Sequence, residues 1–381
     1  MDMRTCEAEL ALVNHDFGDR HWQTRLVHLE RYEQIKVQLG LENRLRETRK
    51  ALIGAYFCHE YSYAAAALTN PSIVPHPDQS GLVGGAVRII LSMRAVGEGH
   101  ISSIAFREGI VTPDGAVQLL PEPRVAMAAH AYDPPPAGIP DGPVQASRYD
   151  EASLSGTVIF PFTPAQSNGL EDLRLLRFRN DDGTTIYYGT YTAYSGRSIA
   201  SEMLVTSDFR TFDLLPMSGT AARNKGMGLF PRKVGGRYAM IGRQDGENIW
   251  FLKSDDLLDW DGGELIITPR FPWELVQMGN CGAPIEIAEG WLLLTHGVGA
   301  MRQYSIGVAL LDKEHPTKVL GRSQQPLISP SDENREGYVP NVVYTCGALA
   351  IGRRLIIPYG VADSSIAFCS VDIDALLKEL V

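Results

Sequence analysis

The spacing of apolar positions changes near residue 70. Before it, apolar side chains recur at steps of three or four, which places them on one face of a helix. A first segment carries the apolar stripe Trp22, Leu26, Leu29, Tyr32, Ile35 and Leu39. A second carries Leu41, Leu45, Leu52, Tyr56 and His59 and extends through Ala64 to Ala67, until Asn70-Pro71 ends it. The pattern predicts an N-terminal helical segment over residues 1–69.

Beyond Pro71 the pattern becomes that of strands. Residues 87–94 and 101–106 are β-rich apolar runs separated by Gly97-Glu98-Gly99. No helical pattern returns until Asp374 to Leu380, so a parallel sheet with crossover helices is disfavoured. We therefore expect residues 70–381 to form an all-β domain.

An internal repeat organises this β region. Met203 to Phe212 and Trp250 to Trp260 each read as an apolar strand, a Ser-Asp turn and an aromatic residue, and weaker echoes stand at 101–106, 304–311 and 365–371. Their spacing is about 50 residues, or about twice that across the Pro-rich stretch 121–150, which is the range of a four-stranded propeller blade. The repeat predicts a β-propeller of five or six blades, with a stacked β-sandwich as the alternative.

Composition narrows the partners. The chain has 381 residues and a formal net charge of −10, which disfavours nucleic-acid and anionic-membrane surfaces but not a neutral sugar. Its five cysteines are scattered, which predicts free thiols in a reducing compartment. Neither an apolar signal core nor a run of about 18 apolar residues is present in the sequence, so we expect a soluble, cytoplasmic protein.

The stretch Gly169-Leu170-Glu171-Asp172-Leu173-Arg174 is the main candidate for chemistry. On a strand, the adjacent carboxylates Glu171 and Asp172 point to opposite faces and therefore meet different environments. Such a pair can hold one carboxyl protonated and its neighbour ionised. An ordinary solvated Asp-Arg pair at a junction between loop and strand is the alternative.

Other polar residues stand once per repeat in apolar or Gly-rich surroundings, where a propeller would gather them around its axis. They are Arg94, Asn224, Lys225, Arg243, Asp245, Glu247, His296 and Asp363. Lys225 precedes a Gly-rich run without the order of a phosphate-binding Walker loop, and His296 could equally be a ligand contact or a core histidine.

His59-Glu60 lacks the second histidine of a zinc helix, because Tyr63 occupies its place, so we expect no metal.

These motifs together resemble glycoside hydrolase family 130, a family of β-mannoside phosphorylases and related β-mannosidases on a five-bladed propeller. The resemblance covers roughly residues 70–375 and rests on several ordered motifs. They are Gly169 to Arg174, Asn224 to Lys233, Gly282 to Pro284, Gly290 to Val298, Leu310 to Asp312 with Pro316, Tyr338 to Val343, and Tyr359 to Asp363.

The resemblance implies roles for particular residues. Asp172 would be the proton donor, acting through a hydroxyl of the bound mannose. Arg94, Lys225, His296 and Asp363 would line the mannose and phosphate subsites. Glu171, Arg174, Asn224 and Arg243 are our further candidates for substrate binding. No cofactor is implied, apart from inorganic phosphate as co-substrate if the enzyme is a phosphorylase.

Two departures from the family bear on the reaction. Leu173 replaces a proline, which should change only local stiffness. Where phosphorylases carry an Asn-Arg pair, this chain has Ser195-Gly196, with Arg197 displaced. Phosphate binding needs several charge-assisted donors, so the loss of this pair disfavours phosphorolysis. An inverting hydrolase needs a second carboxylate about 6.5–9.5 Å from the acid. Glu247 is our candidate base, with Glu286 and Glu336 as further candidates.

We therefore expect a five-bladed β-propeller with an N-terminal α-helical extension that cleaves β-D-mannosides with inversion, hydrolysis being favoured over phosphorolysis. The expected partners are a β-mannoside oligosaccharide and, through the N-terminal helices, further copies of the chain; the family's extensions can serve in oligomer contacts. A glycan-binding propeller without catalysis and a purely structural repeat protein are the alternatives from other classes.

Overall fold

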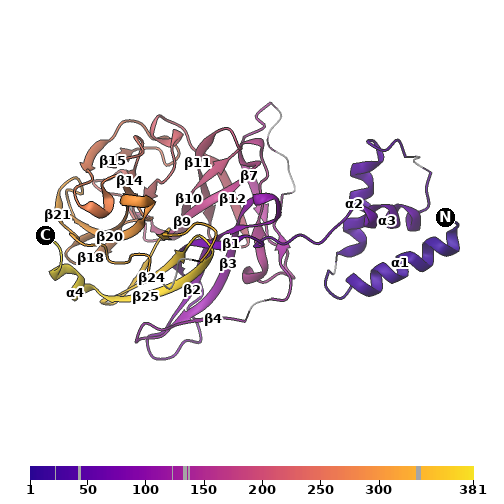
Figure 1. Cartoon of the computed structure of the whole chain (residues 1–381), viewed down its shortest axis with the longest axis horizontal. Coiled ribbons are helices and arrows are strands. Elements are labelled where there is room, and N and C mark those ends of the chain that lie inside the picture. Colours follow the sequence, from indigo (N-terminus) through magenta and orange to yellow (C-terminus); the bar gives the residue numbers. More distant parts are fainter. Residues whose placement is uncertain (22, 42–43, 122, 132–134, 136–137, 332–335) are drawn as a thin grey trace. The chain divides into compact units, whose positions relative to one another are not determined.

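The computed structural model describes residues 1–21, 23–41, 44–121, 123–131, 135, 138–331 and 336–381. The chain divides into two compact units, Met1–Ser62 and Tyr63–Val381. The first is helical and drawn in indigo in Figure 1, and the second is built almost wholly from strands.

The N-terminal unit contains α1 (Met3–Phe17), α2 (Thr24–Lys36) and α3 (Glu47–Tyr56). The buried face of α2 comprises His28, Tyr32 and Ile35, which recur at helical spacing. Helix α3 crosses α2 closely at Gly54, where a Cβ atom would lie 1.7 Å from the carbonyl oxygen of His28. Only glycine permits this approach.

The predicted apolar stripe is only partly the buried face of the helices. Tyr32 and Ile35 are buried, whereas Leu26 is 53% exposed and Leu39 49% exposed, and Trp22 lies outside the described residues. The helical pattern predicted through Ala67 also ends earlier, because Ala67 begins strand β1. A run of alanines is compatible with both states, and pairing with the next strand decides between them.

The β unit begins with antiparallel strands. The first set comprises β1 (Ala67–Pro75), β2 (Val87–Val96), β3 (Ser102–Val111) and β4 (Val117–Leu119). The second comprises β9 (Gly169–Arg179), β10 (Thr185–Tyr194), β11 (Ile199–Thr206) and β12 (Thr211–Pro216), and is extended by β7 (Val144–Ser147) and β6 (His130–Ala131). Strand β8 (Thr157–Ile159) pairs with β3 and with β5 (Met127–Ala128). A parallel bridge between Ser102 and Gly169 joins the two sets.

Three further antiparallel sheets follow in chain order. One contains β13 (Gly228–Leu229), β14 (Tyr238–Gly242), β15 (Ile249–Ser254) and β16 (Glu264–Ile267). The next contains β17 (Gln277–Asn280), β18 (Ile285–Ile287), β19 (Gly290–Val298), β20 (Tyr304–Leu311) and β21 (Val319–Arg322). In the last, β22 (Val343–Tyr344), β23 (Leu349–Ile351) and β25 (Ser365–Asp372) all pair with β24 (Arg354–Val361). Helix α4 (Ile373–Lys378) closes the unit.

The repeated sequence segments correspond to one structural position. Each of them begins at the strand that pairs with the preceding long strand of its set, namely β3 after β2, β11 after β10, β15 after β14, β20 after β19 and β25 after β24. The interval between the first two is wide because β4 to β8 are inserted there before β9 and β10. The predicted all-β class of this region is confirmed, with few helices among the described residues.

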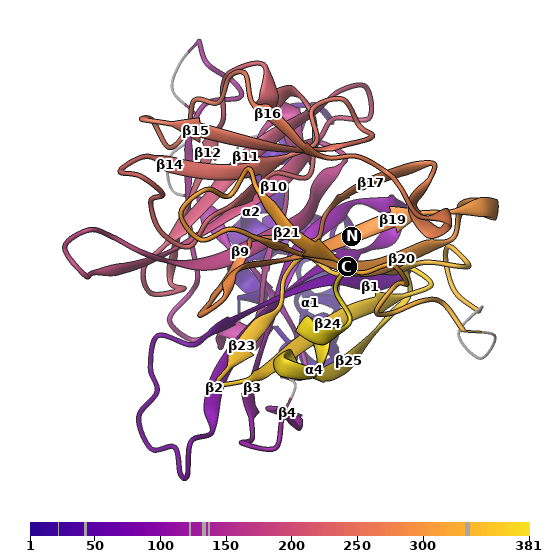
Figure 2. The same ribbon diagram turned by 90° about the vertical axis from the view of Figure 1, so that its left-hand side faces the viewer.

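The apolar cores lie between neighbouring sheets. Phe230, before β14, packs edge-on against Phe251 of β15 and Trp291 of β19, with ring centroids 5.7 and 4.9 Å away. The last sheet packs on the first, because Ile356 of β24 shares a core cluster with Ile73 of β1 and its neighbours. Figure 2 shows β1 and β24 in the same region, where Cys346 N–H also donates to the carbonyl of Pro71.

In the described part of the chain, no helix is long and apolar enough to cross a membrane. Cys6, Cys58, Cys281, Cys346 and Cys369 are free thiols, as the sequence predicts.

Candidate active site

The polar residues gather where the second strand of each set ends. Arg94 lies near the end of β2, His296 near the end of β19, and Arg243 directly follows β14. The first strand of each set pairs with the second, so its residues lie opposite these side chains. Thr69 of β1 is opposite Arg94, and Gly279 of β17 is opposite His296. One end of the sheets therefore carries the candidate residues.

Asp172 is held in a buried, positively charged environment at the start of β9. Its Oδ1 accepts a hydrogen bond of 2.7 Å from Asn70 Nδ2 and lies 3.5 Å from a guanidinium nitrogen of Arg94. Arg174 donates to its backbone carbonyl at 3.2 Å. Burial would raise the pKa of Asp172, but Arg94, Arg174 and Lys225 together hold it below its ordinary value.

The prediction that strand alternation separates Glu171 from Asp172 is wrong, because the β9–β10 ladder shifts register here and Asp172 has a φ of 57°. Glu171 contacts the same guanidinium group as Asp172. Its Oε1 accepts a 2.8 Å hydrogen bond from Arg94, whose Nε donates to Ser102. Burial raises the pKa of Glu171, Arg94 opposes this rise, and the charge of Asp172 adds to it. The two adjacent carboxyls therefore have pKa values displaced in opposite directions.

The backbone around this pair is strained. Asp172, Asn70 and Asp363 all have positive φ angles, of 57°, 49° and 47°. Such conformations cost roughly 1–3 kcal/mol each for residues other than glycine and cluster at functional sites. Gly169 permits the turn into β9, since a Cβ atom there would lie 2.6–2.8 Å from Ser102.

Two arginine side chains, those of Arg174 and Arg243, converge on Gly226. A Cβ atom built on Gly226 would lie 2.8 Å from Arg243 Cδ and 3.8 Å from Arg174 Nη2, so both side chains approach this glycine. Arg174 is buried and its Nη2 donates to Tyr344 Oη at 2.8 Å. Within the described chain, Nε of Arg174 and Nε of Arg243 are buried without a hydrogen-bond partner.

His296 is a neutral imidazole beside these cations. Burial, followed by the charges of Arg243 and Arg174, lowers the pKa of His296 well below its ordinary value. Arg243 Nη1 lies 3.3 Å from His296 Nε2 and can only donate, so Nε2 accepts. Tyr344 packs against the ring with centroids 5.0 Å apart.

Asn224 has a structural role, whereas Lys225 acts through its charge. The Asn224 amide donates to the carbonyls of Arg243 and Gln244 at 3.2 Å, so it fixes the turn after β14. The Lys225 side chain is exposed, yet its charge acts on both Glu171 and Asp172. Asp363 lies on the turn after β24, whose Gly360 approaches Thr69 and Asn70 closely. Burial, followed by the charge of Asp172, raises the pKa of Asp363.

The candidate bases are not placed alike. Glu247 is exposed on the turn after β14, where its backbone N–H is held by Asp245. Glu286 lies at the opposite end of β19, opposite Trp291, and forms a bidentate pair with Arg232 at 2.8 and 3.0 Å. Glu336 is exposed on the loop before β22.

Sequence reasoning missed four polar residues of this region. Asn70, Thr192, Asn280 and Tyr344 are all buried there, and Asn280 Oδ1 and Thr192 Oγ1 lack a hydrogen-bond partner within the described residues. Asn70 was interpreted as the end of a helix. The repeat could have identified Thr192 and Asn280. Thr192 lies near the end of β10, as Arg94 lies near the end of β2, and Asn280 lies on β17, which pairs with the strand of His296.

Comparisons with known proteins agree with this geometry. The profile of a family described as beta-1,4-mannooligosaccharide phosphorylase matches residues 153–380. A beta-1,2-mannobiose phosphorylase from Listeria innocua is 33% identical over 231 residues, which span 58% of this chain and 63% of that enzyme. A 1,2-beta-oligomannan phosphorylase from a Thermoanaerobacter species is 34% identical over 208 residues, 54% of this chain and 68% of that enzyme.

The fold comparison extends further along the chain. The solved structure of the Listeria innocua beta-1,2-mannobiose phosphorylase in complex with beta-1,2-mannobiose superposes with a TM-score of 0.56. This match covers 83% of the present chain and 92% of that structure, at 24% sequence identity. The two proteins share a fold.

Proposed function

The chain belongs to glycoside hydrolase family 130, and on this basis we propose that it is an inverting β-mannoside phosphorylase. The proposed products are α-mannose 1-phosphate and the shortened sugar. The observation that carries the proposal is the pair of converging guanidiniums, Arg174 and Arg243, beside the candidate acid. Both carry buried N–H groups that find no partner among the described residues, which suits an anionic nucleophile.

This reading replaces the expectation of hydrolysis. That expectation rested on Ser195-Gly196, where the family's phosphorylases carry an Asn-Arg pair. Arg174, Arg243 and Lys225 supply cations without that pair, and the names of the relatives favour phosphorolysis over hydrolysis. A phosphorylase needs one protein carboxyl group, whereas Glu247 would have to serve as base in a hydrolase.

The proposed step balances as follows. A phosphate oxygen attacks C1 of the mannosyl group from the face opposite the glycosidic oxygen, forming the new C1–O bond as the old one breaks. The leaving oxygen receives a proton that Asp172 supplies through a hydroxyl of the mannose. Bound phosphate dianion would neutralise the cations that lower the pKa of Asp172, and so would favour the protonated acid.

Phosphate dependence tests the reaction class. With β-1,2-linked and β-1,4-linked mannobiose as substrates, we expect cleavage to rise with added phosphate and mannose 1-phosphate to accumulate. Chromatography and phosphorus NMR distinguish this product from free mannose. Free mannose formed at the same rate without phosphate would identify a hydrolase instead.

Glu247→Gln separates the two mechanisms by mutation. The substitution keeps the shape of the side chain and removes the group that could deprotonate water. We expect turnover within about twofold of wild type, since the nucleophile of a phosphorylase is already an anion. Steady-state kinetics at saturating phosphate measures this, and a loss of 100-fold or more, the order expected on removing a general base, would return Glu247 to the role of base.

We further propose that the sheets from β1 onward are the five blades of a propeller and that the unit Met1–Ser62 is a separate helical segment. The boundary predicted between residues 69 and 70 therefore lies a few residues earlier in the chain. Each sheet packs on the next, and the last packs on the first, as a closed ring requires. The likeness to the Listeria structure supports the same architecture.

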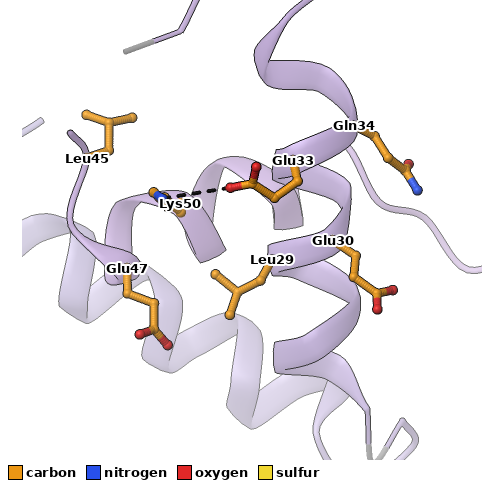
Figure 3. A pocket seen from close by; sticks show the side chains of 7 residues that line it. All are labelled: Leu29, Glu30, Glu33, Gln34, Leu45, Glu47 and Lys50. Carbon is orange, nitrogen blue, oxygen red and sulfur yellow. Dashed lines mark ion pairs between the residues drawn. The ribbon is translucent and has the colours of Figure 1, made fainter. Parts of the chain in front are cut away.

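The helical segment is proposed as an assembly element. A groove between α2 and α3 is lined by Leu29, Glu30, Glu33, Gln34, Leu45, Glu47 and Lys50. Figure 3 shows it with the ion pair of Glu33 and Lys50, whose charged atoms lie 3.8 Å apart. Leu26 and Val37, 53% and 80% exposed, leave further apolar surface on this small unit.

Charged substitutions on this surface test assembly. If further copies cover it, the double variant Leu26→Glu, Val37→Glu should lower the mass measured by light scattering. Leu320→Glu on β21, at a side chain 43% exposed, is the matched control and should keep the wild-type mass. An unchanged mass in the double variant would show that the helices do not assemble the protein.

A further inference from the structure

An exposed aromatic pair stands at the rim of the site. Tyr338 lies in the segment before β22 and is 53% exposed. Its ring centroid is 5.9 Å from that of His100, at 33° between the planes, and Tyr338 Oη lies 3.4 Å from His100 Nδ1.

Both side chains are presented outward by strained or constrained backbone. His100 ends the short helical turn Glu98–His100 between β2 and β3 and has a φ of 60°. Because His100 is exposed, packing in a hydrophobic core does not account for its left-handed backbone. Such conformations cluster at functional sites. This turn directly follows the strand that carries Arg94.

Tyr338 is fixed from both sides onto the turn after β24. Val339 N–H donates to the carbonyl of Ala362 at 2.9 Å. Gly337 approaches the same residue so closely that a Cβ atom there would lie 2.5 Å from Ala362. The next residue of the turn is Asp363, which we propose to contact the sugar. The segment of Tyr338 is therefore held against the residue that precedes this sugar contact.

Asp363 links this rim to the candidate acid. The charges of Asp172 and Arg94 act on it from the buried side, and that of Arg302 acts on it from the turn between β19 and β20. Arg302 is exposed and, like His100, has a positive φ, of 56°. Asp363 is therefore within the electrostatic reach of both Asp172 and Arg302, and the adjacent Ala362 holds the segment that carries Tyr338.

We propose that Tyr338 and His100 form the platform on which the leaving-group sugar stacks, with Arg302 binding its hydroxyls. This proposal rests on the proposed function and specifies its leaving-group subsite. A pyranose has an apolar C–H face that packs on an aromatic ring, while its hydroxyls need donors and acceptors at the edge. The tilted pair offers such a face, with a phenol and a guanidinium beside it.

The reverse reaction isolates this subsite, because the acceptor sugar then binds where the leaving group departs. With mannose 1-phosphate as donor and mannose or mannobiose as acceptor, Tyr338→Ala should raise the acceptor KM about tenfold. The KM for mannose 1-phosphate should stay unchanged, and Tyr338→Phe should restore most of the affinity. Tyr56→Ala, at a tyrosine 64% exposed on the helical unit, is the control and should match wild type.

A substrate without a leaving-group sugar completes the test. Phosphorolysis of β-mannosyl fluoride should be equal in wild type and Tyr338→Ala, since fluoride does not reach the platform. Equal acceptor KM values in an active wild type and Tyr338→Ala would overturn the platform alone. A wild type that turns over neither mannosides with phosphate nor mannose 1-phosphate with acceptor would overturn the proposed function.

Discussion

Asp172→Asn should abolish phosphorolysis of β-mannobiose while leaving a folded protein. Removing a general acid typically lowers the rate by about 10²–10⁴-fold. The asparagine can still accept the hydrogen bond from Asn70 Nδ2, so the local geometry should survive. Initial rates at saturating phosphate and the melting temperature measure the two effects separately.

A second substrate distinguishes a missing proton from a damaged site. Fluoride leaves C1 without protonation, so β-mannosyl fluoride should be cleaved by Asp172→Asn at a rate near that of wild type. Equal losses on both substrates would show that Asp172 serves binding or folding and not proton transfer. Near-native activity on mannobiose would move the acid to another residue, such as the adjacent Glu171.

The same assignment fixes the sign of the pH dependence. The acid must be protonated to act, so the rate falls as the pH rises through the pKa of Asp172. In the free protein the surrounding cations keep this pKa low. Bound phosphate opposes them, so the alkaline fall in rate should move to higher pH as phosphate increases from limiting to saturating.

Much of the site was accessible from the sequence because it is local. Glu171, Asp172 and Arg174 sit within one motif, and strand alternation alone predicts that the two carboxyls meet different surroundings. That prediction is wrong, because a register shift in β9 lets both carboxyls reach Arg94. Their pKa values are nevertheless displaced in opposite directions. The repeat identified corresponding strands, since each of them must pair with an equivalent neighbour in its sheet.

The rest depends on contacts between distant parts of the chain. Asn70 and Tyr344 come from the first and last sheets of the β unit, and only the packing of those sheets brings both beside Arg174 and Asp172. In the helices, the 3.6-residue period does not say which apolar face is buried. Gly54 decides this by admitting α3 against His28, which leaves Leu26 exposed.

Arg243→Gln should weaken phosphate binding and leave mannoside binding largely intact. A hydrogen bond to a charged group contributes about 1.5–3 kcal/mol, so the KM for phosphate should rise roughly 10-fold to 150-fold. The KM for mannobiose at saturating phosphate should change little, because no proposed sugar contact is removed. Loss of the guanidinium also removes one cause of the low pKa of His296, which should rise toward its ordinary value in NMR titration.

A matched arginine on the same sheet supplies the control. Arg237 precedes β14, as Arg243 follows it, and forms an exposed ion pair of 2.9 Å with Asp255. Exposed pairs of this kind contribute about 0–1 kcal/mol, so Arg237→Gln should leave both KM values and the fold unchanged. If Arg243→Gln raised the KM for mannobiose as much as that for phosphate, the converging guanidiniums would be sugar contacts. The anion would then have to bind at Lys225, the remaining cation beside Asp172 that is exposed to solvent.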